Sequence, residues 1–163
     1  ANAYYDQEDD IEGDPSITIE LLMSAENRNG INIDGKGFDA LTFNLSKVIA
    51  HEMLHKSQAS NRDFVKPFKV SFTDPKQEYL GRSDEIEAYA HNIAVDLLRN
   101  YGSRKDVLSA LKNFTRIPAT KSPDLFAYLV VFGMNKNNDV LKKLIKKVIL
   151  YLKELDKWYH FQN

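Results

Sequence analysis

The stretch DALTFNLSKVIAHEMLHKSQAS, residues 39–60, decides the fold, because its apolar residues recur at the spacing of one helical face. The apolar positions are Leu41, Leu45, Val48, Ile49, Met53 and Leu54. We therefore predict a helix over residues 39–60 that buries this face. The helix also carries a His-Glu-x-x-His motif at residues 51–55.

The motif has the spacing of a metal site. His51 and His55 are four residues apart, so both imidazoles leave a helix on the same side and can reach one ion. Glu52 is placed to accept a proton from a metal-bound water without being a ligand itself. The chain has no cysteine, so a zinc ion here needs histidine and carboxylate ligands. The alternative is a pair of ordinary histidines on an amphipathic helix.

A catalytic zinc ion needs a third protein ligand and an open position for water. We expect this ligand on a second helix, predicted from about Ser83 to Tyr101, where small residues allow close packing against the first helix. Glu87 is the leading candidate, and Glu85 and His91 are the alternatives. Glu85 and Glu87 are two residues apart and cannot both face the site. His91 shares the face of Glu87 and could instead orient a ligand.

A hydrogen-bond donor opposite the general base would polarise the substrate carbonyl. Four polar side chains in or just before the second helix are candidates: Tyr79, Arg82, Tyr89 and Asn92. The sequence does not rank them, and a surface role is the alternative for each.

The rest of the pattern predicts a mostly helical α+β fold in one domain, residues 1–163, with an irregular acidic arm over 1–15. Ser16–Met23 is β-branched and alternating, so we expect a strand in a small sheet packed on the motif helix. This strand either pairs with an extended substrate or lies in the core. A short strand is predicted at 69–72, and helices near 103–114, 124–132 and 139–159 complete a helical C-terminal half.

The charge and hydropathy of the chain argue against a general nucleic-acid-binding protein and against a membrane-spanning one. The net charge of -1 gives no general basic surface for nucleic acid. Residues 1–40 hold ten acids and two basic residues, and residues 136–157 hold seven lysines. We interpret these as solvated faces, and a local basic patch for an acidic partner is the alternative. No apolar stretch is long enough to span a bilayer and no signal peptide is visible, so we expect a soluble, intracellular protein.

The sequence His51-Glu52-Met53-Leu54-His55, followed 32 residues later by Glu87-Ala88, resembles the gluzincin metallopeptidases and, more distantly, the ImmA/IrrE peptidases. The resemblance covers about residues 41–98. It implies that His51 and His55 are zinc ligands, that Glu52 is the general base and that Glu87 is the third ligand.

The whole chain is similar to small metallopeptidases encoded by tailed bacteriophages, through residues 14–22, 50–58 and 84–90 and the lysine-rich final helix. This resemblance implies a peptidase with one zinc ion that acts on a peptide or protein. It also implies a location in the cytoplasm of an infected bacterial host or in the virion. The alternative is a zincin-fold binding or structural protein with little turnover, such as a virion or regulatory factor.

Overall fold

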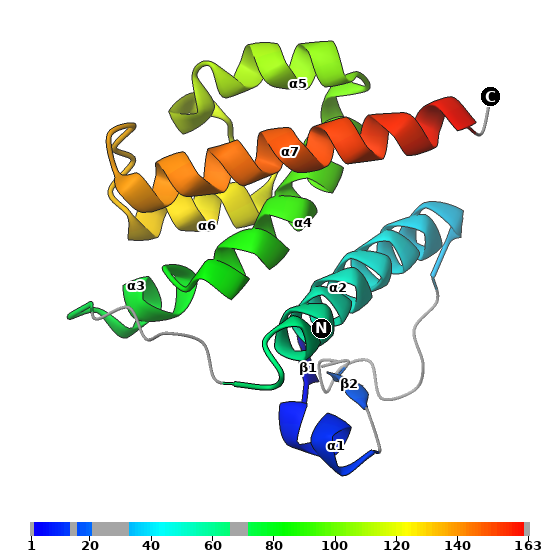
Figure 1. Ribbon diagram of the computed structural model, residues 1–163. Coiled ribbons are helices and arrows are strands. Elements are labelled where there is room, and N and C mark those ends of the chain that lie inside the picture. The colour runs from blue at the N-terminus through cyan, green and yellow to red at the C-terminus, as the bar shows by residue number, and fades with distance from the viewer. Residues whose placement is uncertain (1, 14–15, 21–32, 66–71, 162–163) are drawn as a thin grey trace. The chain divides into compact units, whose positions relative to one another are not determined.

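A computed structural model of the chain describes residues 2–13, 16–20, 33–65 and 72–161. The chain forms two compact units, Ala1–Lys66 (unit 1) and Pro67–Asn163 (unit 2). The described residues form helices and one two-stranded sheet (Figure 1), which confirms the predicted, mostly helical α+β class. The single-domain organisation stays a prediction.

Unit 1 opens with ordered structure where the sequence predicts an irregular arm. Strand β1 (Asn2–Tyr5) pairs antiparallel with β2 (Ile17–Glu20), and helix α1 (Gln7–Glu12) lies between them in the chain. The side chain of Asp6 caps the start of α1, and Gly13 ends it at a φ of 87°, a left-handed conformation that glycine adopts without strain. Most of residues 2–13 are therefore regular rather than irregular, and the description of this segment as an arm stays a prediction. Elements of four and six residues are too short to show a hydrophobic period.

Helix α2 (Gly35–Asn61) carries the His-Glu-x-x-His motif. It begins at Gly35 rather than at Asp39, because the Asp34 side chain accepts a hydrogen bond from the Gly37 N–H at 2.7 Å and caps the helix. Strand β1 packs against α2, as the sequence predicts for the small sheet.

The exposure of α2 differs from that of a simple amphipathic helix. Ile49 and Met53, expected in the buried face, are 42% and 51% exposed. His51 and Glu52 are only 7% and 8% exposed. Two ionisable side chains of the helix are thus buried, while two of its apolar side chains are exposed to water. Burial of such groups costs free energy unless they are paired, so this turn is a candidate site.

The described residues of unit 2 are helical: α3 (Pro75–Leu80), α4 (Ser83–Tyr101), α5 (Arg104–Leu111), the 3-10 helix η2 (Phe114–Arg116), α6 (Pro123–Val131) and α7 (Asp139–Phe161). Helices α4 to α7 lie close to the predicted ranges. Pro75 begins α3, where a proline is tolerated because the first turn of a helix has an N–H without an intrahelical partner. Ser83 is the first residue of α4, and Arg82 is its N-cap.

The core of unit 2 forms where α4 and α7 lie side by side, with α5 and α6 against them (Figure 1). Its fully buried side chains are mostly aliphatic: Ile93, Leu97, Val107, Leu125, Tyr128, Leu129, Leu141, Leu144, Val148 and Leu152. The one polar atom among these side chains, the hydroxyl of Tyr128, donates to the carbonyl oxygen of Leu80 at 3.0 Å. The core is therefore apolar, and its buried hydroxyl group is hydrogen-bonded.

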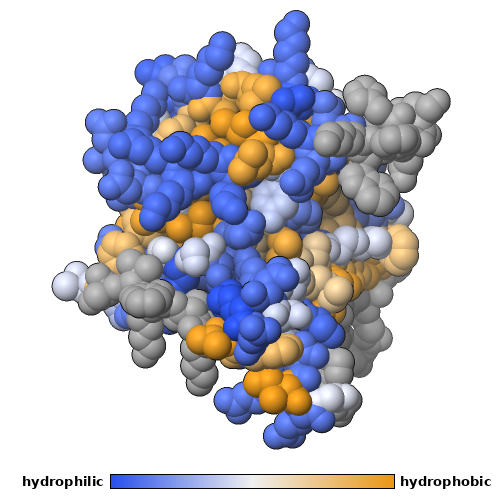
Figure 2. Space-filling model, in the orientation of Figure 1, coloured by the Kyte–Doolittle hydropathy of each residue, from blue (hydrophilic) through white to orange (hydrophobic). Residues whose placement is uncertain are grey.

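Figure 2 shows that hydrophilic side chains cover most of one face of the molecule, with smaller hydrophobic areas between them. Among the helices described here, none is both long and apolar enough to cross a membrane. Two predicted strand segments, residues 21–23 and 69–71, lie outside the described residues.

Candidate metal and catalytic site

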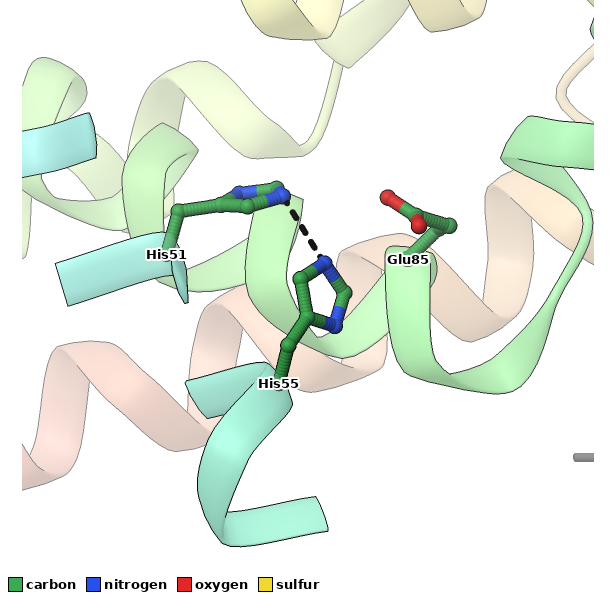
Figure 3. A group of neighbouring side chains, drawn as sticks. All are labelled: His51, His55 and Glu85. Carbon is green, nitrogen blue, oxygen red and sulfur yellow. Dashed lines mark hydrogen bonds between the residues drawn. The ribbon is translucent and has the colours of Figure 1, made fainter. Parts of the chain in front are cut away.

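The two motif histidines of α2 point their Nε2 atoms at each other. The Nε2 atoms of His51 and His55 are 3.1 Å apart, and the rings meet edge to face with centroids at 4.8 Å (Figure 3). Zinc–imidazole bonds of about 2.0–2.1 Å in a tetrahedral arrangement place two ligand nitrogens about 3.3 Å apart. The pair therefore needs only a small adjustment to hold one ion.

Gln58 orients one of these rings. Its Oε1 lies 3.0 Å from the Nδ1 of His55. An amide oxygen only accepts hydrogen bonds, so Nδ1 of His55 carries the proton and its Nε2 keeps a lone pair. This is the tautomer that binds a metal through Nε2, and metal-binding histidines commonly use their second nitrogen in this way.

Glu52 lies on the next position of the helix and is 8% exposed. Its Oε2 accepts a hydrogen bond from the backbone N–H of Tyr5 at 2.9 Å. The first strand of the chain thus ends against the predicted general base. This contact joins residues 47 positions apart in the sequence.

In unit 2, Glu85 lies in the first turn of α4 and is 7% exposed. The phenol of Tyr79 lies near enough to Glu85 for the two groups to interact. Burial raises the pKa of Tyr79 above its ordinary value, and the negative charge of Glu85 raises it further. The first turn of a helix is a place where the partial positive charge of the N-terminus favours a negative side chain.

Glu87, the leading third ligand in the sequence-based prediction, has partners on α7. Its Oε1 lies 2.9 Å from the Nζ of Lys147 and 3.5 Å from the hydroxyl of Tyr151. Burial raises the pKa of Tyr151, and the charge of Glu87 adds to this. Glu87 therefore forms an ion pair within unit 2, on a different side of α4 from Glu85.

The other predicted site residues pack within unit 2. The ring of His91 meets Tyr151 edge to face at 5.3 Å, which places it close to the partners of Glu87. Tyr89 packs against Tyr128 at 5.5 Å. The Arg82 guanidinium lies 5.7 Å from the ring of Tyr79 and 3.8 Å from the Glu78 carboxylate.

Sequence reasoning missed two contributors to this site. Gln58 could have been found, because it follows His55 by three residues and so shares its helical face. The Tyr5 N–H gave no signal, since a backbone donor is present at every residue except proline.

Comparison with protein-family models, with curated proteins and with solved structures finds no match to this chain.

Proposed function

We propose that the chain is a zinc-dependent peptidase in which His51, His55 and a carboxylate of α4 ligate one zinc ion. The observation that carries the proposal is the pair of Nε2 atoms 3.1 Å apart, on a helix whose neighbouring Glu52 is buried. The resemblance of the motif to that of the gluzincins supports the same reaction class.

The third ligand in this proposal is Glu85 rather than Glu87. The ammonium group of Lys147 lies on Glu87 Oε1 and competes with any metal cation for that oxygen. Glu85 is more buried than Glu87, and the neighbouring group that interacts with its carboxylate is the phenol of Tyr79 rather than a cation. Glu87 stays the alternative that experiment must reject.

Each residue then has a defined task. A zinc ion held by these residues would lower the pKa of a bound water and polarise the substrate carbonyl. Glu52 accepts a proton from the attacking water, whose oxygen forms the new bond to the carbonyl carbon. As the carbon–nitrogen bond breaks, Glu52 passes that proton to the leaving amine.

The proposed partner is a peptide or protein substrate, without a role for nucleic acid. Activity in an infected bacterial host or in a virion rests on the resemblance to phage-encoded peptidases alone.

One observation favours a second candidate, a zinc-binding protein with little turnover. Glu52 accepts the Tyr5 N–H, so its carboxylate has a structural partner as well as a proposed catalytic task. A binding or structural protein could keep this contact and the metal without hydrolysing anything.

Metal analysis tests the ligand set. We expect about one zinc ion per chain in the wild type and its loss in His51→Ala and His55→Ala. Glu85→Gln should weaken zinc binding strongly. Glu87→Gln is the matched control on the same helix and should retain the metal; the reverse result would move the third ligand to Glu87.

Hydrolysis of a broad peptide library tests the reaction. Glu52→Gln should keep the zinc ion and lose cleavage, because the amide cannot accept the proton of water. Cleavage at the wild-type rate in this variant would exclude Glu52 as the base. A zinc-loaded wild type that cleaves no peptide would favour the binding protein.

A further inference from the structure

The backbone nitrogen of Tyr5 occupies the place where a peptidase substrate has to meet the general base. Its N–H donates to Glu52 Oε2 at 2.9 Å, and Glu52 is 8% exposed. In the proposed reaction, the same carboxylate must come within hydrogen-bonding reach of a substrate backbone nitrogen to protonate it. The chain therefore presents its own peptide group to Glu52.

The strand that brings this N–H has the form of a bound peptide. β1 pairs antiparallel with β2, and Tyr5 stands opposite Ile17 at the end of the pairing. Peptides commonly bind proteins by adding a strand to the edge of a sheet, where backbone hydrogen bonds hold them. β1 is joined to β2 in this way, and it also reaches α2.

A clasp on the same face of α2 holds this segment in place. One oxygen of the Asp10 carboxylate accepts from the Tyr5 hydroxyl at 2.6 Å, and the other lies 3.6 Å from the Nζ of Lys56. Lys56 is one helical turn after Glu52, so both lie on one face of α2. The Gln7 side chain adds a hydrogen bond to the carbonyl oxygen of Phe64, farther along unit 1.

The clasp is built from charge-assisted contacts that are partly shielded from water. The side chain of Asp10 is 12% exposed and that of Lys56 is 35% exposed. Burial and the nearby Asp10 carboxylate raise the pKa of Tyr5 to about 12. The hydroxyl therefore stays protonated at neutral pH and remains a donor to Asp10.

We propose that residues Asn2–Glu12 form an internal cover that binds Glu52 as an extended peptide does and withholds it from solvent. The cover rests on the proposed function for its role, because there it would keep an incoming water or substrate from the Glu52 carboxylate. The ligand of this site at Glu52 is thus an extended backbone segment that donates an N–H. In this structure the chain's own N-terminal segment is that ligand.

The test loosens the clasp without changing Glu52. Asp10→Ala removes both the acceptor of the Tyr5 hydroxyl and the partner of Lys56. Lys56→Met removes only the ion pair and serves as a second variant. Glu12→Ala is the matched control, since it removes an equal charge from an exposed position of the same helix.

The readout is labelling of Glu52 by a water-soluble carbodiimide and an amine, quantified by peptide mass spectrometry on the protein as purified. We expect Glu52 to be labelled about tenfold faster in Asp10→Ala. The reason is that the variant loses a charge-assisted hydrogen bond that stabilises the segment in its contact with Glu52. Lys56→Met should show a smaller rise, and Glu12→Ala should match the wild type. Peptide hydrolysis by Asp10→Ala should rise in parallel.

The outcomes separate the cover from the peptidase. Equal labelling of Glu52 in all four proteins would overturn the cover, and so would slower hydrolysis in Asp10→Ala, which would make the segment a support for Glu52. Faster labelling without hydrolysis by any variant would uphold the cover and reject the peptidase.

Discussion

Replacement of Gln58 by leucine should weaken zinc binding by about ten- to a hundredfold and leave the fold intact. Gln58 Oε1 lies 3.0 Å from His55 Nδ1 and fixes the tautomer in which Nε2 of that ring is a metal ligand. Loss of a hydrogen bond that orients a metal ligand commonly costs about 10–100-fold in affinity, which equals about 1.4–2.8 kcal/mol. Leucine occupies a similar volume but accepts no hydrogen bond.

The assay is competition for zinc with a chromogenic chelator, with urea unfolding as a check on the fold. Gln58→Glu should restore tight binding, because its carboxylate accepts the same hydrogen bond. Ser57→Ala, at the exposed neighbouring position, should bind zinc like the wild type. An unchanged zinc affinity in Gln58→Leu would refute the orienting role and, with it, the tautomer assigned to His55.

Three further results are expected. The Tyr5 phenol should titrate near pH 12 when followed by absorbance. The protonated phenol should therefore add to the free energy of unfolding below pH 10.0, and this contribution should be lost as the pH rises through 12. A Tyr5→Phe variant with the same alkaline unfolding profile would contradict this. Leu144→Ala should lower the free energy of unfolding in urea by about 2–5 kcal/mol, since Leu144 is fully buried, and a loss under about 1 kcal/mol would mean that the core closes around the cavity. Ser122→Ala should cost about 2 kcal/mol in the same assay, because it removes both the cap of α6 and a donor to buried Asp96; Ser122→Thr should recover much of it, and equal stability of both variants would argue against the hydrogen bonds.

The long helices could be predicted because their cores repeat along the sequence. In α7, Leu141, Leu144, Val148 and Leu152 follow the helical period, and all four are fully buried. Strand β1 and helix α1 could not be predicted in this way. They are shorter than one hydrophobic repeat, and long-range contacts with α2 hold them in place.

Local spacing predicted part of the candidate site, and contacts between distant residues decide the rest. The spacing of His51 and His55 on a helix implies that they meet, and the structure places their Nε2 atoms together. The ion pair of Glu87 with Lys147 joins residues 60 positions apart, and no sequence pattern predicts it. Choosing between Glu85 and Glu87 therefore needs the packing of α4 on α7, which local spacing does not supply.

X-ray absorption at the zinc edge of the loaded protein tests the central claim most directly, because it reports the ligands of the ion itself. We predict two imidazole nitrogens at about 2.0–2.1 Å with carboxylate and water oxygens completing a four-coordinate site, and loss of the imidazole signal in the double variant of His51 and His55. A site of oxygen ligands alone, or an imidazole signal that survives in the double variant, would contradict the account.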